Sequence, residues 1–243
     1  MAKLFEESTS SPLGGRVGRG GDQDVARAAA LRLTFVAPHP QPSPKGEGAR
    51  TSKPLVLEIG FGGGEHLVAR AQAHPDSRFI GVEPFLNGVA SCLRHIEESG
   101  VTNVRLHMGD ARDVLARLPD ASLDVVYVLF PDPWPKARHH KRRLIQPDFI
   151  AELARVLKPG GDVRFATDWA DYAAWTLALF TDRASSDAQC GPEGPRSGRF
   201  TWLAERAADW SEPWPGHTPT RYEQKRLGDC APVWLRFVRT YLR

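Results

Sequence analysis

Three carboxylates follow short apolar runs at regular intervals along the chain. Glu58 lies inside the run Leu55–Ile59, directly before the glycines of Gly60–Gly64, while Glu83 and Asp110 end the next two runs. A carboxylate beside such a loop would repel a pyrophosphate, but it would attract a cationic sulfonium and an amino group. About 20 residues later, Glu83 could accept two ribose hydroxyls, and Asp110 could meet an adenine amino group. These residues predict a site for S-adenosylmethionine.

The glycine loop supports this reading over a dinucleotide site. Gly60 and Gly62 would allow a tight turn and a close approach of backbone to ligand. The dinucleotide pattern G-x-G-x-x-G needs a sixth glycine, but Glu65 stands there. An NAD-linked oxidoreductase is therefore disfavoured, and the remaining alternative is a plain turn flanked by exposed acids.

A second chemical group is the turn Phe130–Lys136, with the sequence FPDPWPK. Two prolines restrict the backbone around Asp132, so its carboxylate would be presented in one geometry. Trp134 offers a flat face on which a base could stack, worth ~1–3 kcal/mol. The turn resembles the (Asn/Asp)-Pro-Pro-(Tyr/Phe/Trp) turn of methyltransferases that act on nitrogen. The alternative is a proline-rich loop whose tryptophan covers the edge of a sheet.

A run of basic residues, Lys136–Arg143, comes next without a single acid. Lysine and arginine directly after an active-site turn could neutralise the phosphates of a nucleic acid. The adjacent His139 and His140 have no cysteine or carboxylate partner at ligand spacing, so no metal site is predicted. In other settings such a run is a solvated face.

Alternating elements must position these groups. Strands are expected at 55–59, 78–83, 104–108, 123–130, 162–167 and 233–241, and helices at 64–73, 84–98, 147–157 and 169–180, with a turn at 158–161. This order predicts an α/β fold: a Rossmann-like, doubly wound, mainly parallel seven-stranded sheet with an antiparallel strand near the C-terminus. Ligands of such sheets bind at the carboxyl ends of the strands, where the carboxylates fall.

Composition sets the limits. The chain has 243 residues, 41% of them hydrophobic and 25% charged, with a net charge of +3. We expect a disordered extension over 1–50, including a short helix at 25–33, and one domain over 51–243 with a loop at 185–198. No apolar run approaches a membrane span, no signal peptide is visible, and three scattered cysteines favour a reduced compartment. The expectation is a cytoplasmic monomer.

The motifs together resemble the bacterial tRNA (guanine-N7)-methyltransferase family over about 53–241. The resemblance rests on five segments in the family order: Leu57–Gly62, Gly109–Ala111, Phe130–His139, Thr167–Trp169 and Thr220–Gly228. The segment with Pro131-Asp132-Pro133-Trp134 and its basic continuation is the most specific of them. The chain departs from the family at Pro84-Phe85 and at Asp229–Arg236, where the usual acid after Trp234 is missing.

The resemblance implies roles for individual residues. Asp132 would be the catalytic carboxylate, close to cofactor and guanine. The cofactor would be held by Glu58, Gly60, Gly62, Glu83, Asp110 and Asp132; the substrate by Lys136, Asp168, Thr220, Arg221, Tyr222 and Glu223; and the RNA by Arg138, His139, His140, Lys141, Arg142 and Arg143. From the residues alone, Asp168 could instead be a helix N-cap and Thr220–Glu223 a surface turn.

The resemblance implies transfer of a methyl group from S-adenosylmethionine to N7 of a guanine in the variable loop of tRNA. N7 carries a lone pair and no proton, so alignment and electrostatics matter more than a strong base. The same residues would also suit a methyltransferase for another RNA or a protein amine. A pure RNA-binding module without activity is disfavoured by the intact carboxylates.

Overall fold

The computed structural model describes residues 53–181 and 199–240. The expected extension over 1–50, its short helix and the whole of the expected loop at 185–198 lie outside these ranges. The strands are β1 (Leu55–Ile59), β2 (Arg78–Glu83), β3 (Val104–Met108), β4 (Leu123–Leu129), β5 (Leu157–Thr167), β6 (Phe200–Trp202) and β7 (Val233–Arg239). The helices are α2 (Glu65–Ala73), α3 (Leu86–Ser99), α4 (Ala111–Leu115), the 3₁₀ helix η1 (Ala137–Arg142), α5 (Pro147–Val156), α6 (Ala170–Thr181), α7 (Ala208–Ser211) and α8 (Arg221–Lys225).

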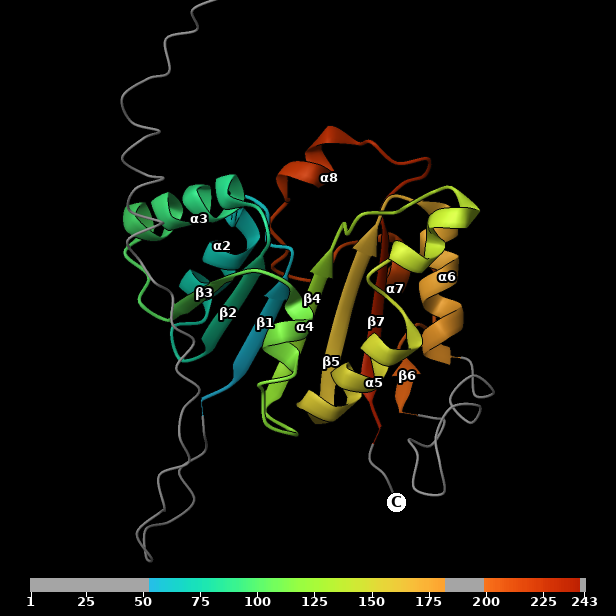
Figure 1. The fold of residues 1–243 in the computed structure, drawn as a ribbon, viewed down its shortest axis with the longest axis horizontal. Helices are drawn as coiled ribbons and strands as arrows, with labels where there is room; N and C mark the ends of the chain where they lie inside the picture. Colours follow the sequence, from blue (N-terminus) through green and yellow to red (C-terminus); the bar gives the residue numbers. More distant parts are fainter. Residues whose placement is uncertain (1–52, 182–198, 241–243) are drawn as a thin grey trace, which may run out of the picture.

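The strands form one seven-stranded sheet in the order β3-β2-β1-β4-β5-β7-β6 (Figure 1). The first five strands run parallel, whereas β7 is antiparallel to β5, and β6 is antiparallel to β7. The chain begins with β1 in the middle of the sheet and continues outward through β2 to β3. It then returns to form β4 on the other side of β1. The predicted fold class is confirmed, with two antiparallel strands near the C-terminus.

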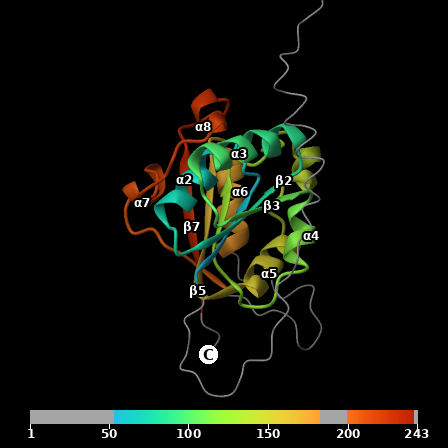
Figure 2. The ribbon, with the colours of Figure 1, turned by 90° about the vertical axis from the view of Figure 1, so that its left-hand side faces the viewer.

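Helices cover both faces of the sheet, as the two views show (Figures 1 and 2). One apolar cluster joins α4, α5 and α6 to one face of the sheet. A second cluster joins α2 and α3, with Trp214, to the opposite face. The almost wholly apolar β4 runs between the two clusters because it is buried on both faces.

Strand β5 differs from the prediction. Lys158–Gly161 was expected to be a turn between a helix and a strand, but β5 begins at Leu157 and runs through it. The register against β4 shifts between the pairs Leu123–Leu157 and Val125–Asp162, so the extra residues are absorbed as an irregularity of the strand.

The last strand also differs in detail. It ends at Arg239 rather than at 241, and Tyr241 lies outside the described residues. Leu235, which occupies the position of the missing family acid, is 2% exposed within the apolar core. An apolar residue therefore suits this position.

Strand order reverses between β1 and β4, which are hydrogen-bonded neighbours. In an open parallel sheet, the crevice at the carboxyl ends of such a pair is where ligands bind. Helix α8 lies above these strand ends in Figure 1. The elements thus leave a binding position between the sheet and α8.

Candidate active site

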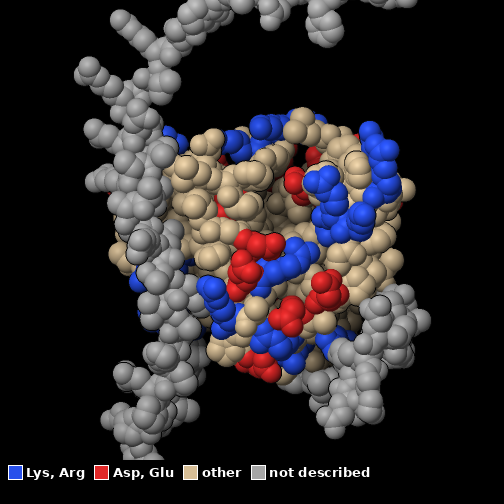
Figure 3. Space-filling view, viewed as in Figure 1, with Lys and Arg blue, Asp and Glu red and all other residues tan. Residues whose placement is uncertain are grey.

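A cavity of about 600 Å³ opens at this reversal point. Its walls come from the glycine loop, the ends of β2, β3 and β4, the start of α3, the end of η1, and α8. The hollow is visible in the upper part of the surface in Figure 3, with basic side chains to its right. Its volume is in the range of small-molecule and cofactor sites.

The glycine loop forms one wall. Gly60 has φ 72° and Gly62 has φ 56°, a region that costs glycine little. The Gly62 N–H donates to the Glu83 carboxylate at 2.9 Å. The ring of Tyr222 lies over Gly62, because a Cβ added there would come within 3.9 Å of it. A side chain at Gly62 would therefore narrow the space between loop and α8.

Glu83 is the most buried carboxylate that lines the cavity. Its second oxygen accepts from the Phe85 N–H at 3.1 Å. Burial raises the pKa of Glu83, the N–H groups of Gly62 and Phe85 oppose this, and the charge of Asp132 adds to it. Further donors, such as ribose hydroxyls, would stabilise this charged group.

Asp110 and Asp132 complete the acidic lining. Asp110 caps α4 by accepting from the Arg112 N–H at 2.8 Å, which leaves its carboxylate at the cavity wall. Asp132 is exposed between its two prolines. The backbone there is unusual, since Phe130 has φ 51° and Trp134 has φ 43°. Such conformations are sparsely populated for large side chains, and they turn the chain sharply on either side of Asp132.

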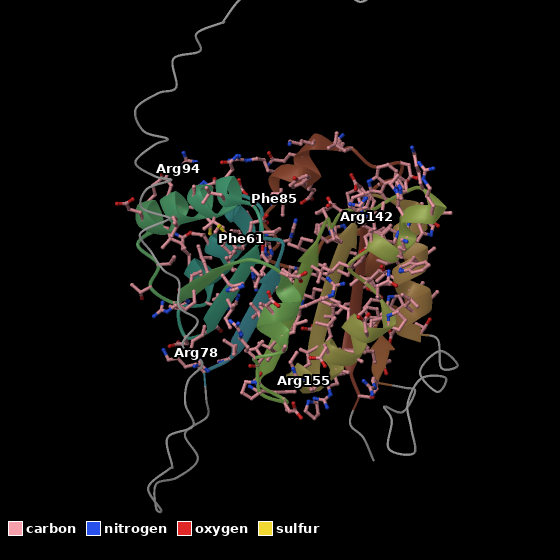
Figure 4. All side chains as sticks on the ribbon, viewed as in Figure 1. Phe61, Arg78, Phe85, Arg94, Arg142 and Arg155 are labelled. Carbon is pink, nitrogen blue, oxygen red and sulfur yellow. The ribbon has the colours of Figure 1, made fainter. Side chains whose placement is uncertain are left out.

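Trp134 lines the cavity, but one of its faces is occupied. The guanidinium carbon of Arg142 lies 3.6 Å from the centre of a Trp134 ring. Arg142 and Phe85 stand on opposite sides of the cavity in Figure 4. A base could stack on the free face of Trp134, or on the other face after displacing Arg142.

Arg143 requires a correction. It was expected to contact RNA, but it is 1% exposed. Its guanidinium pairs with Asp171, donates through Nε to the Pro133 carbonyl oxygen at 2.9 Å, and lies near the rings of Tyr172 and Trp175. A side chain enclosed in this way cannot reach a phosphate in solution.

The other residues of the basic run differ in their exposure to solvent. Arg138, Lys141 and Arg142 are exposed, as is Lys136 at the start of η1. The two histidines are only partly exposed: His139 meets Trp134 edge to face, and His140 lies 3.4 Å from Asp171.

Glu58 lies away from the cavity. Its neighbours Leu57 and Ile59 face the α4 and α5 side, so strand alternation turns Glu58 toward α2. There it is 2% exposed, and the ring of His66 donates to it at 2.7 Å. The loop and Ile59, rather than this carboxylate, line the cavity.

Asp168 does not line the cavity either. Its carboxylate accepts from the Gly228 N–H at 2.8 Å, and its carbonyl accepts from Cys230. The alternative of an N-cap for α6 is also wrong, because the Ala170 N–H donates to Asp229 instead. Asp168 thus ties the chain after α8 to the end of β5.

Two of the four predicted residues in Thr220–Glu223 face the cavity, namely Arg221 and Tyr222. Thr220 and Glu223 instead form a capping box, in which each side chain accepts from the backbone N–H of the other. Arg221 also bonds to Glu65, at the start of α2. The alternative of a surface turn is wrong, since this segment forms helix α8.

Several cavity residues were not predicted. Phe85 is 68% exposed at the cavity. The others are Asn87, Ser91, Arg112, Leu144 and Lys225. Phe85 carried a signal as a departure from the family pattern, and Lys225 lies within the family segment Thr220–Gly228. Asn87, Ser91 and Arg112 reach the cavity from helices, and Leu144 from the segment between η1 and α5, which no local motif reveals.

Among the described residues, no helix is long and apolar enough to cross a membrane. The same residues contain no group of three or more metal-ligating side chains.

Comparison with known proteins agrees with this geometry. A family model described as "Putative methyltransferase" matches residues 52–191. The tRNA (guanine-N(7)-)-methyltransferase of Caulobacter vibrioides is 57% identical over 188 residues, which are 77% of this chain and 76% of that protein. The protein of the same name from Hyphomonas neptunium is 51% identical over 74% of this chain and 76% of its own length.

Among solved structures, a precorrin-6y C5,15-methyltransferase from Geobacter metallireducens aligns with a TM-score of 0.49 and 14% identity, covering 78% of this chain and 80% of that one. The strand order alone establishes the fold class. Identity near 57% across three quarters of both chains is decisive for the family. The chain belongs to the family of bacterial tRNA (guanine-N7)-methyltransferases.

Proposed function

We propose that this enzyme transfers a methyl group from S-adenosylmethionine to N7 of a guanine in the variable loop of tRNA. The observation that carries the proposal is the convergence of three carboxylates, Glu83, Asp110 and Asp132, around one cavity at the reversal point of the sheet. The names of the relatives specify the methylated base and the RNA.

The residues of the cavity fit S-adenosylmethionine. Glu83, with two backbone donors already bound, has lone pairs left for ribose hydroxyls. Asp110 stands at the end of the next strand, where an adenine amino group would be met. Gly60 and Gly62 leave the loop open to the amino acid part. When bound, S-adenosylmethionine supplies an electrophilic methyl group on a positively charged sulfur.

Asp132 is the proposed catalytic residue. Guanine N7 would attack the methyl carbon through its lone pair. The bond from that carbon to sulfur would break with its electron pair going to sulfur, and the positive charge would pass to the methylated base. A fixed carboxylate favours this developing charge, most of all where the cavity excludes water. Asp132 also accepts a hydrogen bond from the N1 or amino hydrogen of guanine and so orients the base.

Substrate binding falls to groups around the cavity mouth. Arg221 and Tyr222, on α8, face the bound base. Lys136, Arg138, Lys141 and Arg142 neutralise RNA phosphates, with His139 and His140 beside them. Asp168 acts indirectly through the segment after α8 that it holds, and Glu58 through its bond to His66 of α2. The proposal includes action as a monomer in the cytoplasm.

The test is nucleoside mass spectrometry of unmodified tRNA incubated with the protein and S-adenosylmethionine. We expect 7-methylguanosine from the wild type and a loss of about 10²–10³ in kcat for Asp132→Asn. The affinity for S-adenosylhomocysteine should be retained in the variant. Unchanged turnover in Asp132→Asn would remove the catalytic role. Methylation of ribosomal RNA or a protein instead of tRNA would redirect the proposal to that acceptor.

A further inference from the structure

A chain of buried polar side chains connects strand β1 to helix α8 on the side of the sheet away from the cavity. It begins with Glu58 and His66, whose side chains are 3% and 2% exposed and whose atoms Oε2 and Nδ1 lie 2.7 Å apart. It ends with His217 and Glu223, whose atoms Nε2 and Oε2 also lie 2.7 Å apart. The rings of His66 and His217 connect the two pairs, with centroids 5.3 Å apart.

His217 is enclosed by aromatic side chains. Its ring meets Trp234 of β7 at 4.5 Å between centroids, and its backbone N–H donates to the Trp214 carbonyl. The Glu223 carboxylate can only accept, so Nε2 of His217 carries the proton. Nδ1 of His217 is then a buried acceptor without a partner among the described residues. Such a group is costly, which indicates that the ring is held here for the bond to Glu223.

Glu223 links His217 to the start of helix α8. The same oxygen, Oε2, accepts from the Thr220 N–H at 3.3 Å, which is half of the capping box that starts α8. Helix α8 has only five residues, too few to be stable alone. Its placement must therefore come from these contacts and from its neighbours.

Helix α2 also bonds to α8 and to the segment before it. Arg70 donates to the Gly216 carbonyl at 3.1 Å, and Glu65 accepts from Arg221 at 3.1 Å. Both contacts are exposed, whereas His66 is buried and the side chain of His217 is only 4% exposed. Helix α2 follows the glycine loop directly, so the helix that continues this loop also holds α8.

The face of α8 opposite Glu223 meets the cavity, and it includes Arg221, which Glu65 holds. It presents Arg221, Tyr222 and Lys225, with Tyr222 over Gly62. A small displacement of α8 would move all three side chains relative to Asp132, since they belong to one short helix. Glu83 and Asp110, on the opposite side of the cavity, would keep their own partners.

We propose that His217 and Glu223, backed by the Glu58–His66 pair, are positioning residues that hold α8 over the cavity for the RNA substrate. This inference rests on the proposed function, because it assigns α8 to the acceptor rather than to the methyl donor. It gives Glu58 and Glu223 a role without contact to either ligand.

The test compares four variants: His217→Phe, Glu223→Ala, their double variant and Glu223→Gln. His217→Phe keeps a ring among the tryptophans but loses the donor. Gln224→Ala is the matched control, because Gln224 is exposed on the same helix next to Glu223. The measurements are KM for tRNA and kcat at saturating S-adenosylmethionine, and the Kd of S-adenosylhomocysteine.

We expect each single variant to raise KM for tRNA about tenfold, as for one lost charge-assisted hydrogen bond. The double variant should stay near this value rather than reach about a hundredfold, because both changes remove the same bond. Glu223→Gln keeps an acceptor and should recover most of the loss. The Kd of S-adenosylhomocysteine should change less than about threefold, and Gln224→Ala should match the wild type.

Two outcomes would overturn the inference. One is a KM for tRNA that stays at the wild-type value in both single variants. The other is a loss of S-adenosylhomocysteine binding in step with KM, which would mark a general structural role. If His217→Phe does not fold, the pair Glu223→Ala and Glu223→Gln decides. The same assay tests the proposed function separately, because a wild-type protein that makes no 7-methylguanosine would overturn that function itself.

Discussion

The side chain of Arg143 donates through Nε to the backbone carbonyl oxygen of Pro133, 2.9 Å away. Pro133 directly follows Asp132, so a buried cation is bonded to the peptide next to the proposed catalytic carboxylate. The same guanidinium pairs with Asp171 of α6. The turn Phe130–Lys136 is thus linked to helix α6 through the side chain of Arg143.

Replacing Arg143 with methionine should therefore affect both stability and turnover. The loss of a hydrogen bond to a charged group predicts a decrease of about 1–3 kcal/mol in the free energy of unfolding. The Pro133 carbonyl would lose its partner, Asp132 would be less well placed, and kcat should fall. Urea unfolding and initial rates measure the two effects. Lys141→Met, at an exposed position two residues away, should keep the wild-type free energy of unfolding. Wild-type kcat in Arg143→Met would contradict this attachment.

The exposed cations of the basic run should act on RNA affinity instead. Each phosphate contact contributes roughly 0.7–0.9 to the slope of log affinity against log salt. The double variant Arg138→Ala, Lys141→Ala should raise KM for tRNA and lower that slope by about 1–2, with kcat unchanged. The measurement is KM across a range of salt concentrations. A fall in kcat alone would exclude these residues from the RNA interface.

Trp134 should contribute by stacking on the base. Trp134→Ala should raise KM for tRNA about tenfold or more, given ~1–3 kcal/mol for a base on an aromatic ring. Trp210→Ala is the control, because Trp210 is 40% exposed on α7 and does not line the cavity. Equal KM values in the two variants would show that the base does not stack on Trp134.

His217 should make stability depend on pH. Burial lowers the pKa of His217 below its ordinary 6.5, and the bond to Glu223 only partly opposes this. Below pH 6.5 the unfolded chain binds this proton more readily than the folded chain, so stability is full above pH 6.5 and decreases as the pH falls. The free energy of unfolding of His217→Phe, measured from pH 5 to pH 8, should decrease less on acidification than that of the wild type. Parallel curves would mean that His217 binds its proton equally in both states.

Gly228 should not accept a side chain. A Cβ there would overlap the backbone and the carboxyl carbon of Asp168, which cannot move without breaking its bond to the Gly228 N–H. Gly228→Ala should cost about 1–3 kcal/mol in the free energy of unfolding, as for an overpacked core. Gly100→Ala meets nothing within 4 Å and has only the strain of φ +68°, about 1 kcal/mol. A thermal melt that shows the larger loss for Gly100→Ala would contradict the contact with Asp168.

Much of this site could be predicted from the sequence because its parts are local. Glycines after an apolar run and acids at the ends of the next runs identify β1, β2 and β3 and place Glu83 and Asp110. The prolines around Asp132 restrict their own backbone. These features depend on neighbours in the chain, and the structure has them where they were expected.

The features that were missed depend on distant partners. Arg143 looks like its basic neighbours, and the side chains of Asp171, Tyr172 and Trp175 that enclose it come about 30 residues later. The direction of Glu58 could have been inferred, since Leu57 and Ile59 alternate with it in β1. The three residues of β6 carry too short a pattern to predict a strand. Lys158–Gly161 has the composition of a turn, but β5 runs through it, because Leu157 and Asp162 on either side both pair with β4.

The position of β7 has a consequence for the order in which the sheet can be completed during synthesis. Among the described strands β6 pairs with β7 alone, and β7 separates it from β5. When β6 leaves the ribosome it has no hydrogen-bonding partner, because the strand that must receive it is still to be made. Five parallel strands can form first, with β5 as a temporary edge. In the nascent enzyme β5 therefore remains an unpaired edge until Val233–Arg239 is made, and this one strand then pairs with both β5 and β6.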